Sequence, residues 1–127
     1  MMKLILIAFA GGMGSLARYL VSGWAQRFSV GSFPLGTLIV NVAGCLLIGV
    51  VAAAASGRFI LREEIRVVLQ VGFIGGFTTF SAFGYETFSL FTDGQMKSAL
   101  LNLALNNVLS LAAVWLAYRV TQSWWGV

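Results

Sequence analysis

The stretch GFIGGFTTFSAFGYE, residues 72 to 86, decides the architecture of this chain. It is apolar enough to lie within a bilayer, yet it places glycines and hydroxyl side chains where a membrane-spanning helix is normally most regular. Glycines weaken a helix, and hydroxyl groups can bond the backbone groups that a break leaves free. These residues are Gly72, Gly75 and Gly76, followed by Thr78, Thr79 and Ser81. The segment predicts a helix interrupted near residues 75–79, although the same residues also suit a kink filled by packed phenylalanines.

The composition places the whole chain in a membrane. Its 127 residues are 59% hydrophobic and 9% charged, with a mean hydropathy of +0.91, which leaves too few charged side chains for the surface of a soluble domain. Uncharged runs long enough to cross a hydrocarbon core recur along it. We therefore predict an all-α integral membrane protein of the cell (inner) membrane, multi-pass and surrounded by the lipid bilayer. Its single domain has four transmembrane helices, at about residues 3–24, 36–55, 67–91 and 96–124, the third broken in mid-membrane.

The rare residue types exclude several kinds of chemistry. The chain has no histidine and one cysteine, Cys45, which rules out a disulfide within the chain, a Cys/His metal site and histidine-based catalysis. No nucleophile–base pair is evident, so we do not expect an enzyme. We expect no nucleic-acid partner either. A cleavable signal peptide is disfavoured, because Lys3 and its apolar run lead into further apolar sequence.

Basic residues are divided almost evenly between the two sides of the predicted bundle. One side has five, namely Lys3, Arg58, Arg62, Arg66 and Arg119, and the other has three, namely Arg18, Arg27 and Lys97. The segment RFILREEIR, residues 58–66, is the most charged and is predicted to be an interfacial loop or helix cap. Since orientation follows the excess of basic residues, so small a bias predicts a chain that can insert both ways.

Polar residues form stripes along three of the predicted helices. The stripes are Gly11, Gly14, Ser15 and Arg18; Thr37, Asn41 and Gly44; and Asn102, Asn106 and Ser110. Residues three or four apart share a helix face, and such stripes serve either as helix–helix packing surfaces or as the lining of a pathway. We favour packing for the first stripe and leave both roles open for the third. Glu86 is the one carboxylate within a span, and Arg18 can pair with it or each can lie at an interface.

Two phenylalanines follow the predicted break. Phe80 and Phe83 are three residues apart, so both rings can face one passage. Because a phenyl ring is positive at its edge, ring edges in a narrow passage form a weak anion site from which an ion can leave. A broken helix also exposes carbonyl oxygens from its first half, which are ligands for a cation.

Four segments together resemble the Fluc (CrcB) family of small bacterial fluoride channels. They are GGMGSLARY at residues 11–19, GTLIVNVAG at 36–44, GFIGGFTTFSAF at 72–83 and NNVLSLAAV at 106–114. The resemblance covers nearly the whole chain. It implies a dual-topology homodimer of two antiparallel copies, with two fluoride pathways at the subunit interface and one central structural sodium ion.

The resemblance also implies roles for particular residues. The fluoride pathway would comprise Phe80, Phe83, Asn41, Ser110, Thr37, Ser81, Thr79, Asn106 and Asn102. The backbone carbonyls of Gly75 and Thr78 would bind the sodium ion, and Arg18 matches the basic residue of the family's first-helix motif. From the residues themselves, Arg18 and Glu86 are assigned a vestibule or structural role. The chain departs from the family at Ala82, which replaces a second hydroxyl residue, and at Asn102 and Asn106, where tyrosine or serine is expected.

The predicted function is therefore a fluoride-selective channel that passively exports fluoride down its electrochemical gradient. The alternative is a small dual-topology multidrug-type transporter, but such a transporter needs a carboxylate in its first helix and none is present here. A non-conducting assembly factor is a third possibility, although it would need neither polar stripes nor a helix break.

Overall fold

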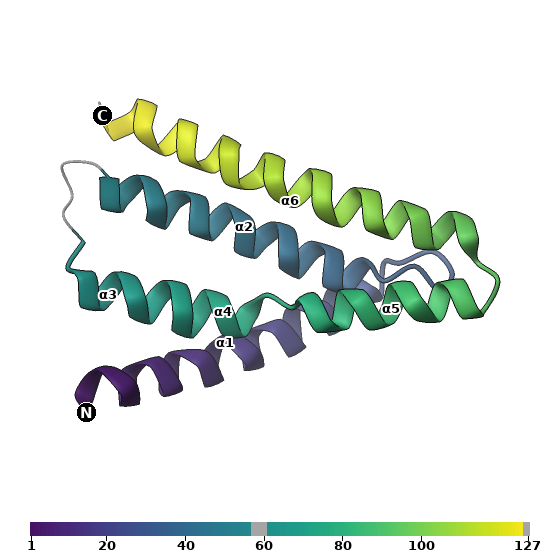
Figure 1. The fold of residues 1–127 in the computed structure, drawn as a ribbon, viewed down its shortest axis with the longest axis horizontal. Coiled ribbons are helices and arrows are strands. Elements are labelled where there is room, and N and C mark those ends of the chain that lie inside the picture. Colours follow the sequence, from purple (N-terminus) through teal and green to yellow (C-terminus); the bar gives the residue numbers. More distant parts are fainter. Residues whose placement is uncertain (57–60, 126–127) are drawn as a thin grey trace.

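The computed structural model describes residues 1–56 and 61–125, which form a bundle of long helices (Figure 1). The elements are α1 (Met2–Gln26), α2 (Leu35–Ser56), α3 (Glu63–Val67), the π-helical segment η1 (Val68–Ile74), α4 (Gly75–Phe77), α5 (Phe80–Thr92) and α6 (Met96–Trp125). Four helical spans are long and apolar enough to cross a membrane, the third being the composite Glu63–Thr92. The all-α prediction with four spans is confirmed.

The third span differs from its prediction at its start. It was expected to begin near residue 67, after a charged loop or cap at 58–66, but α3 already begins at Glu63. Glu63 and Glu64 lie in the first turn, where carboxylates favour a helix because they complement its dipole. Residues 58–60 of the predicted loop lie outside the described residues. The π-helical turn η1 was not predicted, and π-helical segments are rare within spans.

The break is also narrower than predicted. Only Thr78 and Thr79 leave the helix, both with extended backbone, at φ −82° and ψ 159° and at φ −150° and ψ 116°. Gly75 and Gly76 remain helical in α4. A new helix begins at once, because the Thr79 hydroxyl accepts a hydrogen bond from Ala82 N at 3.1 Å and caps α5.

The glycines instead allow α1 to approach the third span closely. A Cβ on Gly14 would overlap the carbonyl oxygen of Phe73, and one on Gly76 would overlap that of Gly11. Ser15 Oγ donates to Gly76 O across the same contact, at 3.4 Å. Small residues at a contact let two membrane helices meet at backbone distance. The predicted packing role of Gly14 and Ser15 is confirmed.

The turn between α1 and α2 is held by one glutamine. Gln26 Nε2 donates to Phe33 O at 2.9 Å, and Gly36 N donates to Gln26 Oε1 at 2.9 Å. The second bond satisfies one of the backbone N–H groups that the start of α2 leaves free. One side chain thus joins the end of α1 to the beginning of α2.

A Schellman turn joins α5 to α6. Gln95 N donates to Leu90 O at 2.8 Å and Gly94 N to Phe91 O at 3.1 Å. The turn needs a residue in the left-handed backbone conformation, and Gly94 adopts it with a φ of +74°. The turn lies in the interval between the predicted spans 67–91 and 96–124.

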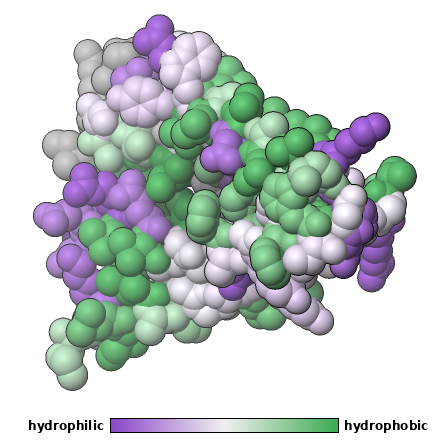
Figure 2. Space-filling view, turned by 45° about the vertical axis from the view of Figure 1, so that its right-hand side comes forward, coloured by the Kyte–Doolittle hydropathy of each residue, from purple (hydrophilic) through white to green (hydrophobic). Residues whose placement is uncertain are grey.

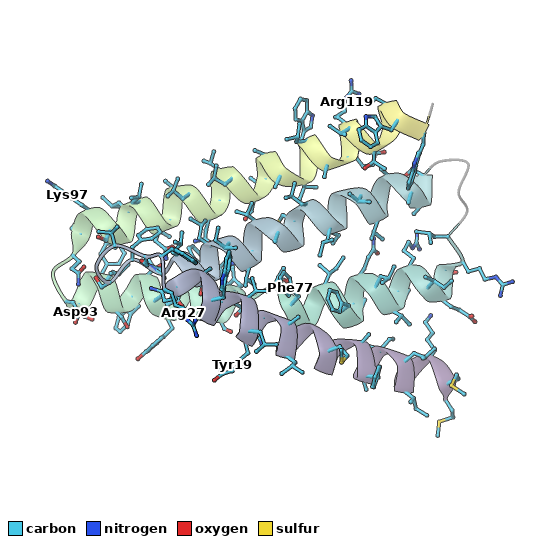
Figure 3. The ribbon with its side chains drawn as sticks, turned by 180° about the vertical axis from the view of Figure 1, so that it is seen from behind. Tyr19, Arg27, Phe77, Asp93, Lys97 and Arg119 are labelled. Atoms are coloured by element: carbon cyan, nitrogen blue, oxygen red, sulfur yellow. The ribbon has the colours of Figure 1, made fainter. Side chains whose placement is uncertain are left out.

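Most of the charged groups labelled in Figure 3 lie toward the two ends of the bundle. Both termini lie at one end of the bundle in Figure 1, together with the start of α3. Figure 3 shows Arg119 toward that end and Arg27, Asp93 and Lys97 at the other. In Figure 2, apolar side chains cover broad areas of the visible face, with hydrophilic groups concentrated toward its margins. Such a distribution suits a protein surrounded by lipid.

Candidate functional site

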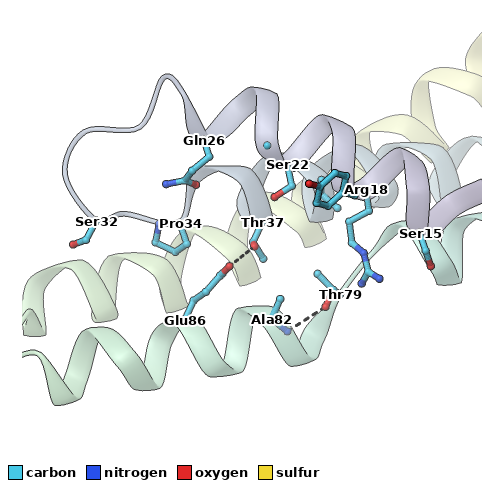
Figure 4. A pocket seen from close by; sticks show the side chains of 13 residues that line it. Ser15, Arg18, Ser22, Gln26, Ser32, Pro34, Thr37, Thr79, Ala82 and Glu86 are labelled. Carbon is cyan, nitrogen blue, oxygen red and sulfur yellow. Dashed lines mark hydrogen bonds between the residues drawn. The ribbon is translucent and has the colours of Figure 1, made fainter.

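The break separates two cavities. The polar cavity, of about 610 Å³, lies between α1, α2 and α5 (Figure 4), and its polar lining includes Ser15, Arg18, Ser22, Gln26, Thr37, Thr79 and Glu86. The phenylalanine cavity, of about 330 Å³, lies between α2, the break and α6, and its lining includes Asn41, Thr78, Thr79, Phe80, Phe83, Asn106 and Ser110. Thr79 lines both, so the broken backbone stands between the two cavities.

Asn41 holds the broken backbone open. Its Oδ1 accepts a hydrogen bond from Thr79 N at 2.9 Å, and its Nδ2 donates to Thr79 O at 3.1 Å. In a continuous helix, Thr79 N would bond the carbonyl of Gly75 instead. The Asn41 side chain of α2 therefore replaces the hydrogen bonds that the break removes from the third span. Buried backbone N–H and C=O groups need such partners.

Glycine lets α2 reach the break. A Cβ on Gly44 would overlap Cγ2 of Thr78. Gly44 lies three residues after Asn41, on the same face of α2. The predicted stripe of Thr37, Asn41 and Gly44 thus forms one contact surface, in which the glycine provides proximity and the asparagine provides hydrogen bonds.

The two predicted phenylalanines lie together beside Asn41. Their ring centroids are 5.4 Å apart with an interplanar angle of 61°, an edge-to-face arrangement. Phe83 is buried, with 6% of its surface exposed, whereas Phe80 is 81% exposed. Phe80 therefore projects from the chain, next to a cavity whose other wall carries Ser110 of α6.

Arg18 and Glu86 both line the polar cavity but do not bond each other. Thr37 Oγ1 donates to Glu86 Oε1 at 2.7 Å (Figure 4). Arg18 Nη1 donates to Thr78 O at 3.5 Å. Glu86 Oε2 is buried and has no hydrogen-bond partner among the described residues. Arg18 was counted with the basic residues of one end, but it lies beside the break because its guanidinium reaches that backbone.

The remaining predicted residues divide into bonded and exposed groups. Asn106 is buried and accepts a hydrogen bond from Asn41 Nδ2 at 3.1 Å, whereas Asn102 is fully buried and lines neither cavity. Ser81 is exposed, with its hydroxyl 3.3 Å from that of Thr79. The structure therefore gathers five of the predicted pathway residues in the phenylalanine cavity besides Thr79, namely Phe80, Phe83, Asn41, Asn106 and Ser110.

The carbonyl of Gly75 suits a cation at the surface of the chain. Thr79 N donates to Asn41, so the Gly75 carbonyl lacks the donor that a continuous helix would supply, and Gly75 is exposed. Thr78 O points to the same broken segment but already accepts the long bond from Arg18. Both groups are oxygen donors without charge, which is a ligand set for a hard cation such as sodium.

The family of the chain follows from its sequence relatives. Residues 5–118 match the family described as "CrcB-like protein, Camphor Resistance (CrcB)". The chain belongs to the CrcB family. The match extends from the early part of α1 to the last turns of α6, so it includes both cavities and the break between them.

Several relatives of this family carry a functional name. A protein of Nitratidesulfovibrio vulgaris is 47% identical over 116 residues, 91% of this chain and 94% of its own length. One from Geobacter metallireducens is 43% identical with the same coverage, and one from Rhizobium etli is 42% identical over 123 residues, 97% of this chain and 98% of its own. Each is named a fluoride-specific ion channel. The predicted resemblance is confirmed, and the chain is a multi-pass membrane protein.

Proposed function

We propose that this protein is a fluoride channel rather than an enzyme or a pump. The observation that carries the proposal is the broken third span, which brings Phe80, Phe83 and the Asn41 amide to one cavity. An anion there meets ring edges and N–H or O–H donors, and no fixed positive charge that would hold it. The names of the relatives supply the identity of the anion.

The proposed pathway uses residues from both sides of the break. Fluoride would exchange water for partners in the polar cavity, where Thr37 and Thr79 lie, and then for Asn41, Phe83 and Phe80 in the second cavity. Ser110 and Asn106 line the wall opposite Phe80, and Ser81 follows on the exposed side. Movement is passive, and it is outward when the electrochemical gradient of fluoride is directed outward.

The proposed assembly is a homodimer of two antiparallel copies, each inserted in the opposite orientation. Phe80 and Ser81 project from the chain beside the cavity, so a second copy would complete the wall of the pathway. The small charge bias supports insertion both ways. Among the described residues, the end with the termini carries Lys3, Arg62, Arg66 and Arg119, whereas the other carries Arg27 and Lys97 once Arg18 is placed at the break.

Replacing Phe80 by isoleucine tests the pathway. We expect fluoride efflux from fluoride-loaded liposomes to be fast for the wild type, with chloride retained, and to fall at least tenfold for Phe80→Ile, because a branched alkyl group has no positive ring edge. Phe88→Ile is the matched control, since Phe88 is 63% exposed on the same helix. We expect this variant to conduct fluoride as the wild type does. Absence of efflux from a folded wild-type dimer would overturn the channel function.

Replacing Glu86 by glutamine distinguishes a channel from a proton-coupled transporter. In Glu86→Gln, the amide oxygen can still accept the hydrogen bond from Thr37. We therefore expect fluoride efflux to stay within about twofold of the wild type. A transporter that carried protons on this carboxylate would instead lose its transport completely.

We further propose that the carbonyls of Gly75 and Thr78 from two copies bind one structural sodium ion. When bound, the ion would supply positive charge at the centre of the dimer, where four uncharged carbonyl oxygens would coordinate it. Sodium measured by elemental analysis after desalting should amount to one ion per two chains. A ratio of one per chain, or no retained sodium in a dimer of defined mass, would contradict both the site and its symmetry.

A further inference from the structure

A chain of side-chain amides connects the break to the middle of α5. Asn41 Nδ2 donates to Asn106 Oδ1 at 3.1 Å, and Asn106 Nδ2 donates to Asn102 Oδ1 at 2.8 Å. Asn102 Nδ2 then donates to Thr87 Oγ1 at 2.9 Å, and Thr87 Oγ1 donates to Phe83 O at 2.7 Å. The chain thus runs from α2 through two successive turns of α6 and ends on the backbone of α5.

The direction of every bond in this chain is determined by its two ends. Thr79 N can only donate, and it donates to Asn41 Oδ1; Phe83 O can only accept, and it accepts from Thr87. Asn41 must therefore turn its Nδ2 toward Asn106. Each following amide then has a single orientation in which an oxygen meets an N–H group, and no group in the series can flip alone without placing two acceptors or two donors together.

The arrangement leaves Asn41 without a free donor. An amide has two N–H hydrogens, and those of Asn41 are taken by Thr79 O and by Asn106 Oδ1. An anion that approaches Asn41 has to compete with one of these acceptors. The Thr79 bond is part of the pairing that holds the break, so the Asn106 bond is the one that can be exchanged without unpairing the backbone.

We propose that Asn102 and Asn106 are positioning residues, which act on the break and on the anion donor through Asn41. Asn106 holds the exchangeable hydrogen of Asn41, and Asn102 holds the side chain of Asn106 in place. Asn102 is 0% exposed and lines neither cavity, so it has no surface to offer to an ion. Only the functional readout rests on the proposed channel activity; the positioning role itself rests on the hydrogen bonds.

Amide exchange at the break tests this role without any transport measurement. In Asn102→Leu, Nδ2 of Asn106 loses its 2.8 Å partner and keeps only the 3.3 Å bond to the Asn102 backbone oxygen, so the Asn106 side chain should be held less firmly against Asn41. We expect hydrogen exchange at Thr79 N, which bonds Asn41, to rise about tenfold. Exchange at Thr78 N, which bonds Ile74 O at 2.9 Å instead of Asn41, should stay unchanged. Unchanged exchange at Thr79, or an equal rise at both amides, would overturn the proposal.

Fluoride efflux supplies the second measurement. We expect Asn106→Ala and Asn102→Leu each to lower efflux about tenfold, and the double variant to be no slower than Asn106→Ala alone, because Asn102 acts through Asn106. Gln122→Leu, which removes an amide near the end of α6, is the control. If the double variant reduced efflux by the product of the two single reductions, the proposal would be overturned. A wild type that does not conduct would overturn the channel function, and the exchange experiment would still decide the positioning role.

Discussion

Fluoride efflux should fall to the level of protein-free liposomes when Asn41 is replaced by aspartate. The substitution preserves size and keeps one oxygen to accept from Thr79 N. It also turns the Nδ2 donor into an oxygen, which then faces Thr79 O and Asn106 Oδ1. The new oxygen would face two other acceptors with no hydrogen between them, which is unfavourable. The aspartate would also place a negative charge on the proposed anion path. The effect is measured with an electrode that records the fluoride released from proteoliposomes.

The matched control for this change is Gln122→Glu. Gln122 also carries an amide on a spanning helix, but its Nε2 donates to Tyr118 Oη of the same helix, at 3.1 Å, away from the break. We expect efflux from Gln122→Glu to remain within about twofold of the wild type. If Asn41→Asp elutes as a folded dimer and conducts as fast as the wild type, Asn41 neither holds the break nor donates to fluoride.

Alanine at Gly14 should destabilise the protein strongly, whereas alanine at the neighbouring Gly12 should not. A Cβ at position 14 overlaps the carbonyl oxygen of Phe73, a backbone atom that cannot move without shifting the third span. Overpacking of this kind costs about 3 kcal/mol. Gly12 has no atom within 4 Å of its Cβ position, so alanine there should add about 0.5–1 kcal/mol of helix stability.

Unfolding of the two purified variants in mild detergent measures this difference. The pair is informative because both glycines lie on α1, two residues apart, and receive the same side chain. Equal unfolding midpoints for Gly14→Ala and Gly12→Ala would mean that α1 does not approach the third span at backbone distance. A fall in efflux in parallel with stability for Gly14→Ala would link this contact to the break that follows Phe77.

Much of the architecture could be predicted from the sequence because a bilayer imposes simple rules. Uncharged runs of sufficient length predicted all four spans, and their ends agree with the structure to within two residues for α1, α2 and α6. The start of the third span was missed because a charged segment was assigned to a loop, although its first-turn glutamates favour a helix.

The break was predicted near residues 75–79 and lies at Thr78 and Thr79, but its extent and its cause could not be predicted from local sequence. Glycines were expected to interrupt the helix, yet Gly75 and Gly76 stay helical, and Gly76 serves the contact with α1. The threonines leave the helix because Asn41, distant in sequence, pairs with both backbone groups of Thr79. Propensity describes a residue and its neighbours, whereas this pairing depends on where another helix places its side chain.

The candidate site, too, could be predicted from the sequence only in part. The sequence by itself determined that polar residues line three spans and that two phenylalanines follow a weak point, since periodicity places such residues on one face. It left open whether Asn102 and Asn106 were packing or pathway residues. Only the tertiary structure decided that they bond in series toward Asn41, because a hydrogen-bond chain exists only when three helices bring donors and acceptors within about 3 Å of each other.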